Sequence, residues 1–364
     1  MVNLRSVMHH LRFIEKKPFV SLRMMRGLFN TLILRKPTLR TVDLAVTYDC
    51  HYGCEYCSAK FLHKPDKQPM TVEQMARVLK DASKLGRIHT NFTGGEPLMR
   101  NVDDLCKLLK KTKAKSHLYS LVTNSLNVSK EKLTQLKEAG LDTIQLSIES
   151  LDPEENDRIR GTPGSFKKTM DALKWSKELG LNICLSTVVT HQNIHNLKEM
   201  IKFSWDHKCS LLLNKASSSG KWADKKEMKM HREDLDLFEK LLKIPHTRSD
   251  IIFNFRGFQG CPGGIERLYI TAYGDVLMCP HVQISYGNAL EEPLETIYRR
   301  MTQMPHLNSR STVCKHAFDK EFYMDYLLPI ENVKQMPIHY KEHPKWQKSV
   351  ASAPESPRSQ EIIE

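Results

Sequence analysis

One stretch of fifteen residues, 43–57, constrains the fold of this chain more than any other. Alternating apolar residues predict a strand, and three cysteines follow it within eight positions: Val42, Leu44 and Val46, then Cys50, Cys54 and Cys57. Thiolates at spacings x3 and x2 on one loop can converge on one iron–sulfur cluster, holding three irons and leaving the fourth iron open to a small chelating ligand. The alternatives are a zinc loop and three unrelated thiols, although zinc sites usually carry two separated cysteine pairs.

Short β-rich runs alternate with helical stripes after this stretch. Strands are predicted near residues 43–47, 88–92, 117–122, 142–148, 182–188 and 209–213. Six βα repeats of about 30 residues require a parallel sheet with right-handed crossovers, and six are too few for the usual closed eight-stranded barrel. We therefore predict an α/β fold with a partial (β/α)6 TIM-like barrel, whose chemistry lies at the carboxyl ends of the strands.

Polar motifs follow the later predicted strands. They are Gly94-Gly95-Glu96-Pro97, Thr123-Asn124-Ser125, Ser147-Ile148-Glu149 and the run from Asn156 to Gly161. Adjacent glycines let the backbone approach a ligand closely, and Glu96 could accept a hydrogen bond from an ammonium group. For Ser147 and Arg160, a helix cap and a surface ion pair are the structural alternatives.

In this order and on these elements, the motifs resemble those of radical S-adenosylmethionine (radical SAM) enzymes, over about residues 41–213. The resemblance implies that Cys50, Cys54 and Cys57 hold a [4Fe–4S] cluster whose open iron binds the amino and carboxylate groups of S-adenosylmethionine. One electron then cleaves the sulfonium to give a 5′-deoxyadenosyl radical. The implied cofactor-binding residues are Gly94, Gly95, Glu96, Asn124, Ser147 and Arg160. The chain departs from the family pattern at Glu149 and Asn156, which replace the usual Asp and His.

Three further cysteines, Cys261, Cys279 and Cys314, accompany a predicted hairpin at residues 268–278. This segment resembles the twitch extension of radical SAM enzymes, a shortened SPASM domain that binds an auxiliary [4Fe–4S] cluster. The resemblance implies a small C-terminal α+β iron–sulfur domain. No cysteine follows Cys314, so His281, His316 or another group completes the site, or one auxiliary iron is open. A Cys3His zinc site and buried thiols without metal are the alternatives.

The remaining cysteines, Cys106, Cys184 and Cys209, lie within helix or strand patterns and are predicted core residues. Nine cysteines in a chain of 364 residues do not form a secreted disulfide framework, so we expect a cytoplasmic protein. No apolar run is long enough to cross a bilayer, and no signal peptide is evident.

The positive charge of this chain gathers at its beginning. The net charge is +13, and residues 1–40 carry nine Lys or Arg against one acidic residue, Glu15. Aromatic residues do not alternate with these basic ones, so we expect no nucleic-acid partner. Two helical stripes broken at Pro18 are predicted here: Leu4, Val7, Met8, Leu11 and Ile14, then Leu22, Met25, Phe29, Leu32 and Ile33. They indicate either a basic helix in peripheral contact with a membrane or a lid packed under the barrel.

We predict five segments along the chain. They are residues 1–40 (basic N-terminal helices), 41–213 (radical SAM barrel), 214–250 (linker and helix), 251–335 (twitch-like domain) and 336–364 (a disordered tail). The expected partners are S-adenosylmethionine, a low-potential electron donor such as flavodoxin or ferredoxin, and an organic substrate that is a peptide, carbohydrate or lipid. The alternative function is a non-catalytic iron–sulfur or zinc protein that keeps the fold.

Overall fold

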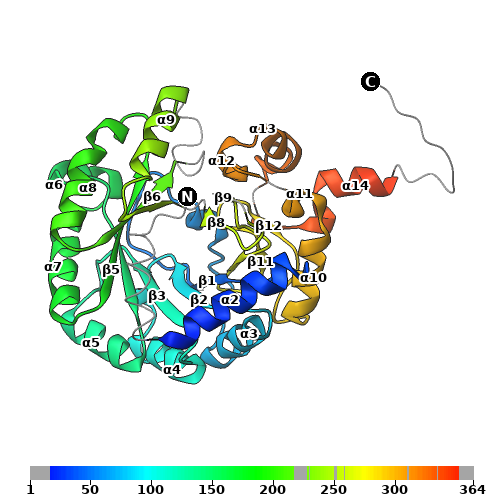
Figure 1. The fold of residues 1–364 in the computed structure, drawn as a ribbon, viewed down its shortest axis with the longest axis horizontal. Coiled ribbons are helices and arrows are strands. Elements are labelled where there is room, and N and C mark those ends of the chain that lie inside the picture. Colours follow the sequence, from blue (N-terminus) through cyan, green and yellow to red (C-terminus); the bar gives the residue numbers. More distant parts are fainter. Residues whose placement is uncertain are drawn as a thin grey trace.

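A nine-stranded sheet organises the computed structural model, which describes residues 17–216, 228, 230–249, 252–257, 259–309, 311–333 and 335–351 (Figure 1). The strand order is β11-β10-β1-β2-β3-β4-β5-β6-β7. Its central part consists of β1 (Thr41–Thr47), β2 (His89–Gly94), β3 (Leu118–Thr123), β4 (Thr143–Ser147), β5 (Asn182–Val189) and β6 (Ser210–Lys215). Each pairs in parallel with the next, which confirms the predicted α/β fold and partial barrel.

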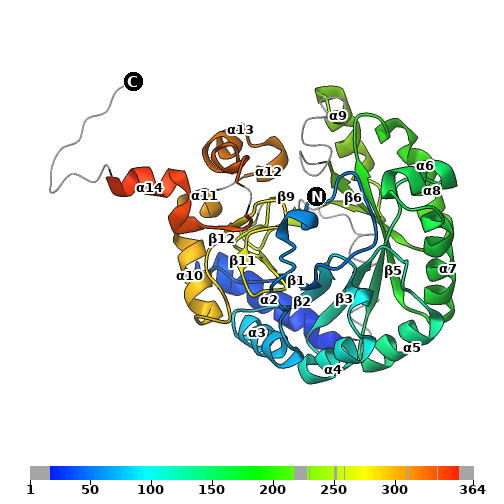
Figure 2. The ribbon, with the colours of Figure 1, turned by 180° about the vertical axis from the view of Figure 1, so that it is seen from behind.

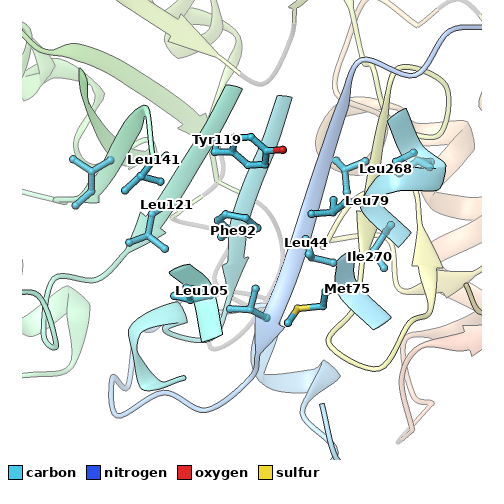
Figure 3. Packing of buried hydrophobic residues seen from close by; sticks show 14 of the residues in the cluster. Leu44, Met75, Leu79, Phe92, Leu105, Tyr119, Leu121, Leu141, Leu268 and Ile270 are labelled. Atoms are coloured by element: carbon cyan, nitrogen blue, oxygen red, sulfur yellow. The ribbon is translucent and has the colours of Figure 1, made fainter. Parts of the chain in front are cut away.

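Helices cover the outer face of this sheet and form the rim seen in Figure 1. They are α3 (Val72–Lys84), α4 (Val102–Thr112), α5 (Lys130–Ala139), α6 (Pro153–Arg160), α7 (Ser165–Glu178) and α8 (Leu197–Asp206). Alternate strand residues such as Leu44, Phe92 and Leu121 pack against them in one apolar cluster (Figure 3). Cys106, Cys184 and Cys209 are buried, as predicted for core residues.

The opposite, concave face of the sheet carries polar side chains. Asp43 accepts hydrogen bonds from Asn91 Nδ2 at 2.6 Å and from Arg267 Nε at 2.5 Å. One strand further on, His89 Nε2 lies 2.7 Å from Ser120 Oγ. Buried polar groups are tolerated where they are paired, and these pairs join neighbouring strands. The interior of the barrel is therefore built from paired polar groups, in contrast to the apolar outer face.

The predicted C-terminal hairpin is present as β10 (Arg267–Ile270) and β11 (Val276–Leu277). The hairpin does not form a separate small sheet, because β10 pairs in parallel with β1 and extends the barrel sheet at that edge. At the other edge, β7 (Thr247–Ser249) follows α9 (Arg232–Leu241) and pairs with β6. The smaller C-terminal elements are β8 (Ile252–Phe253), β9 (Gln259–Gly260), β12 (Ile284–Ser285), α10 (Leu294–Gln303), α11 (Pro305–Asn308), α12 (Lys315–Phe318) and α13 (Lys320–Phe322).

The prediction of a disordered tail from residue 336 is wrong for residues 336–351. Strand β13 (Ile338–His339) pairs with β12, and helix α14 (Pro344–Ala351) follows. The Trp346 ring lies 5.5 Å from that of Tyr326 and 6.1 Å from that of Tyr340. Aromatic contact of this kind stabilises the segment despite its polar and proline-rich composition. Residues 352–364 lie outside the described part of the chain.

Helix α2 (Pro18–Leu32) begins at the predicted break, with Pro18 in its first turn, where a missing N–H costs nothing. Val20 packs with Ile88 and Phe255, and Gly27 allows the Phe255 ring to approach the helix backbone. These contacts agree with the hypothesis that this helix is a lid packed under the barrel. The first predicted stripe, from Leu4 to Ile14, lies outside the described residues. No helix in the described ranges has the length and apolar character needed to span a bilayer.

Candidate functional site

The loop that leaves β1 brings three thiols together. Cys50 is exposed, Cys54 and Cys57 are half-buried, and all three are free. Burial raises the pKa of Cys54 to about 11 against the lowering effect of Arg160, and the neighbouring Cys57 and Cys50 thiols raise it further. The three thiols therefore lie on one loop, near enough to influence one another's pKa, and their role as cluster ligands stays a prediction.

Gly94, the last residue of β2, and Gly95 pack against the base of this loop. The Gly95 N–H donates to the Thr47 carbonyl at 2.8 Å, and the Glu96 N–H donates to the Asp49 carbonyl at the same distance. A Cβ at Gly94 would lie 2.0 Å from the Thr47 oxygen, and one at Gly95 would lie 2.5 Å from the Asp49 oxygen. The double glycine therefore lets the backbone approach the cysteine loop closely. From the sequence, this close approach was expected to be made to a ligand.

The Glu96 carboxylate is held by the protein. Its Oε1 accepts from Thr123 Oγ1 at 2.8 Å and from the Leu98 N–H at 3.0 Å, while Oε2 accepts from the Asn124 N–H at 2.7 Å. The side chain of Asn124 in turn donates to Cys50 Sγ at 3.5 Å. Glu96 is 1% exposed, and burial raises its pKa. It thus joins the ends of β2 and β3 and places Asn124 beside the first cysteine.

Tyr56, Glu149 and Arg160 form a buried network behind the cysteine loop. The Tyr56 hydroxyl donates to Glu149 Oε1 at 2.5 Å, and Arg160 Nη1 lies 2.6 Å from the Tyr56 oxygen and 3.4 Å from Glu149 Oε1. The other carboxylate oxygen accepts from the Val188 N–H at 2.8 Å. Arg160 is therefore a buried network residue, and the surface ion pair considered from the sequence is wrong.

Ser147 ends β4 on the concave face, where it is half-buried and in register with Ser186 of β5. Its carbonyl accepts a hydrogen bond from Thr169 Oγ1 at 3.4 Å. This position places the hydroxyl on the same face of the sheet as Gln145. A helix cap, the alternative for Ser147, is instead provided by Asp152, which accepts from the Glu155 N–H at the start of α6.

The three later cysteines also come together. Burial raises the pKa of the Cys279 thiol, and the neighbouring Cys261 and Cys314 thiols raise it further. The rings of the two candidate histidines, His281 and His316, lie 5.0 Å apart. Burial holds the pKa of His316 well below its usual value, which keeps the imidazole neutral as metal ligation requires.

Direct contacts join the segments that carry the two cysteine groups, and no local pattern predicts these contacts. Tyr48, two residues before Cys50, has its hydroxyl 3.1 Å from that of Tyr269 in β10. Gln283 Nε2 donates to the Ser58 carbonyl at 3.0 Å, directly after Cys57. Because β10 pairs with β1, the hairpin between Cys261 and Cys279 lies beside the strand from which the first cysteine loop leaves.

The donor sets suit iron–sulfur clusters, since each group offers three thiols in a partly buried setting. Within the described ranges, no three His, Cys, Asp or Glu side chains are grouped closely enough to hold a single metal ion. That finding concerns single-ion sites, because the thiolates of a cubane cluster bind separate irons.

Comparison with known proteins gives one matching family and a consistent set of relatives. Residues 44–204 match the Radical SAM superfamily. The PqqA peptide cyclase of Rhizobium meliloti (strain 1021) is 28% identical over 272 residues, which cover 70% of this chain and 72% of that protein. That match extends well beyond residues 44–204 in length.

The fold is shared with solved structures of Streptococcus suis SuiB. The structure bound to S-adenosylmethionine has a TM-score of 0.57 at 17% identity, covering 76% of this chain and 69% of that one. The structure bound to the precursor peptide SuiA has a TM-score of 0.59 at 17% identity, covering 76% and 68%. At this identity the likeness establishes the fold alone.

Proposed function

Because residues 44–204 are a radical SAM domain, we propose that this chain reductively cleaves S-adenosylmethionine and abstracts a hydrogen atom from a peptide substrate. The observation that supports the proposal is the grouping of Cys50, Cys54 and Cys57 on the loop that leaves β1, with Asn124 Nδ2 donating to Cys50 Sγ at 3.5 Å. Bound together, a [4Fe–4S] cluster and S-adenosylmethionine supply a carbon radical that can attack an unactivated C–H bond. The electron would come from a low-potential donor of the flavodoxin or ferredoxin type.

The roles of the protein residues in this proposal follow from their contacts. Cys50, Cys54 and Cys57 are the cluster ligands. Gly94 and Gly95 fix the loop against the end of β1, and Glu96 holds Asn124 toward the cluster. Arg160 and Ser147 lie on the neighbouring α6 and β4, where they would meet the rest of the cofactor.

A peptide substrate is favoured over a carbohydrate or lipid by the relatives. The matched relative is a peptide cyclase, and one SuiB structure holds a precursor peptide. Residues 251–335 are proposed as the auxiliary-cluster domain, with Cys261, Cys279 and Cys314 as ligands of a second [4Fe–4S] cluster.

The test of this function is cleavage of S-adenosylmethionine by anaerobically reconstituted, reduced protein. We expect formation of 5′-deoxyadenosine and methionine, and loss of both in the variant C50A/C54A/C57A. The variant C106A/C209A is the matched control, because both thiols are buried in the apolar cluster between the sheet and its helices. Cleavage that persists in the triple variant would refute the assignment, and folded protein that forms no 5′-deoxyadenosine would favour the non-catalytic alternative.

A further inference from the structure

The outer face of α2 exposes a row of large apolar side chains in the described structure. Five large side chains at helical spacing are 49–66% exposed and form what we term the outer strip: Phe19, Leu22, Met25, Phe29 and Leu32. Ile33 and Leu34 continue it past the helix end at 66% and 47% exposure. Contiguous apolar surface of this kind on a folded protein marks an interaction site.

The orientation of α2 is fixed by its inner face. Val20 and Gly27 are buried against the barrel, and Arg23 Nη2 donates to the Ser83 carbonyl. Just before the helix, Lys17 Nζ pairs with Asp142 Oδ2 at 2.7 Å and donates to the His117 carbonyl. The outer strip cannot turn inward without breaking this partly buried ion pair and the packing at Phe255. The contacts of the inner face therefore hold the outer strip on the outside of the protein.

The surroundings of the outer strip are cationic. Arg26, Arg35 and Lys36 are exposed beside it, and Glu15 is the one acidic residue in the first 40. An isologous contact between two copies of this face would bring like charges together, which opposes a dimer. We propose that the outer strip docks this protein on an anionic lipid bilayer. Apolar side chains then enter the headgroup boundary, and the cations meet anionic headgroups.

The position of α2 determines which way a docked molecule faces. Its partners Ile88 and Leu118 stand at the amino ends of β2 and β3, whereas the cysteine loop leaves the carboxyl end of β1. A strand of six or seven residues separates these ends by roughly 20 Å. Figure 1 shows α2 in front of the strands, and Figure 2 shows it behind them. Docking thus turns the cysteine site away from the bilayer, toward a substrate that arrives from water.

The test is co-sedimentation of the full chain with vesicles of phosphatidylcholine alone or with phosphatidylglycerol added. We expect binding to the anionic vesicles that weakens with salt, as screening of the cations requires. In the variant L22Q/M25Q/F29Q the bound fraction should fall at least about tenfold, since each buried apolar side chain contributes more than a factor of ten. The matched control is W205Q, which alters an equally exposed apolar side chain on α8 and should bind as the wild type does.

Several outcomes would overturn the proposal. One is a wild-type chain that fails to bind anionic vesicles at low salt, or an α2 variant that binds as well as wild type. Another is a wild-type dimer that the α2 variant converts to a monomer without any vesicle binding, because the occupant would then be a second copy. Vesicle binding that appears only after deletion of residues 1–16 would show that the chain's own beginning covers the strip.

Discussion

The Tyr56 hydroxyl donates a hydrogen bond of 2.5 Å to Glu149 Oε1, which ties the cysteine loop to the end of β4. Glu149 is buried and Tyr56 is half-buried, and the buried Arg160 completes the contact from α6. The aromatic residue before the last cysteine therefore acts through its hydroxyl group. The cysteine loop, the end of β4 and α6 thus come together at the Glu149 carboxylate, and the shape of the loop depends on these contacts.

Removing the Tyr56 hydroxyl tests this dependence. In Y56F the Glu149–Arg160 pair loses a buried partner, so the free energy of unfolding should fall by roughly 1.5–3 kcal/mol. A chelator should also remove iron from the reconstituted variant faster. The control is Y52F, because the Tyr52 hydroxyl is buried and has no hydrogen-bond partner in the described structure. Equal iron release from Y56F and wild type would contradict a role of the network in holding the loop.

Gly95 and Gly53 form a matched pair in the same site. A Cβ at Gly95 would lie 2.5 Å from the carbonyl oxygens of Tyr48 and Asp49, whereas one at Gly53 would meet nothing closer than 3.6 Å. G95A should displace the cysteine loop and weaken S-adenosylmethionine binding at least about tenfold, or about 1.4 kcal/mol. G53A should bind nearly as wild type does. Calorimetry on the anaerobic, reconstituted proteins measures both, and a G95A affinity equal to that of G53A would refute the docking argument.

Ser125 is strained where it stands. Its φ is +73°, it is fully buried, and its hydroxyl has no hydrogen-bond partner in the described structure. Glycine adopts this conformation without steric cost, so S125G should raise the free energy of unfolding by roughly 1 kcal/mol. Denaturant unfolding measures the gain. S125A separates the two causes, because it removes the unpaired hydroxyl and keeps the strained backbone. A destabilised S125G would show that the hydroxyl has a partner in the working protein.

Metal analysis tests the second cysteine group. The variant C50A/C54A/C57A keeps Cys261, Cys279 and Cys314, so after reconstitution it should retain about four irons and four sulfides per chain. Adding C261A and C279A should remove them. Zinc in place of iron, or no metal in the triple variant, would eliminate the auxiliary cluster and with it a role in electron transfer or substrate binding.

Local patterns were sufficient to predict the barrel. Each of the six predicted strands is present, because alternation of apolar and polar residues reflects the two faces of a sheet directly. The spacing of the first cysteine group also lies within one loop, and its role as a cluster site stays a prediction from that spacing. The tail from residue 336 was predicted wrongly, because its order depends on Trp346 meeting Tyr326, a contact that no local pattern reveals.

The sequence by itself determined the strands, the cysteine loop and the amphipathic character of residues 18–33, since each is a property of neighbouring residues. Only the tertiary structure decided which partners those residues meet. It joined β10 to β1, engaged Glu96 and Glu149 with protein donors, and turned the Phe19–Leu32 strip outward while Val20 and Gly27 packed inward. The physical reason is that hydrogen bonding and burial between distant segments depend on where the folded chain places those segments. The spacing of residues along the sequence does not predict these positions.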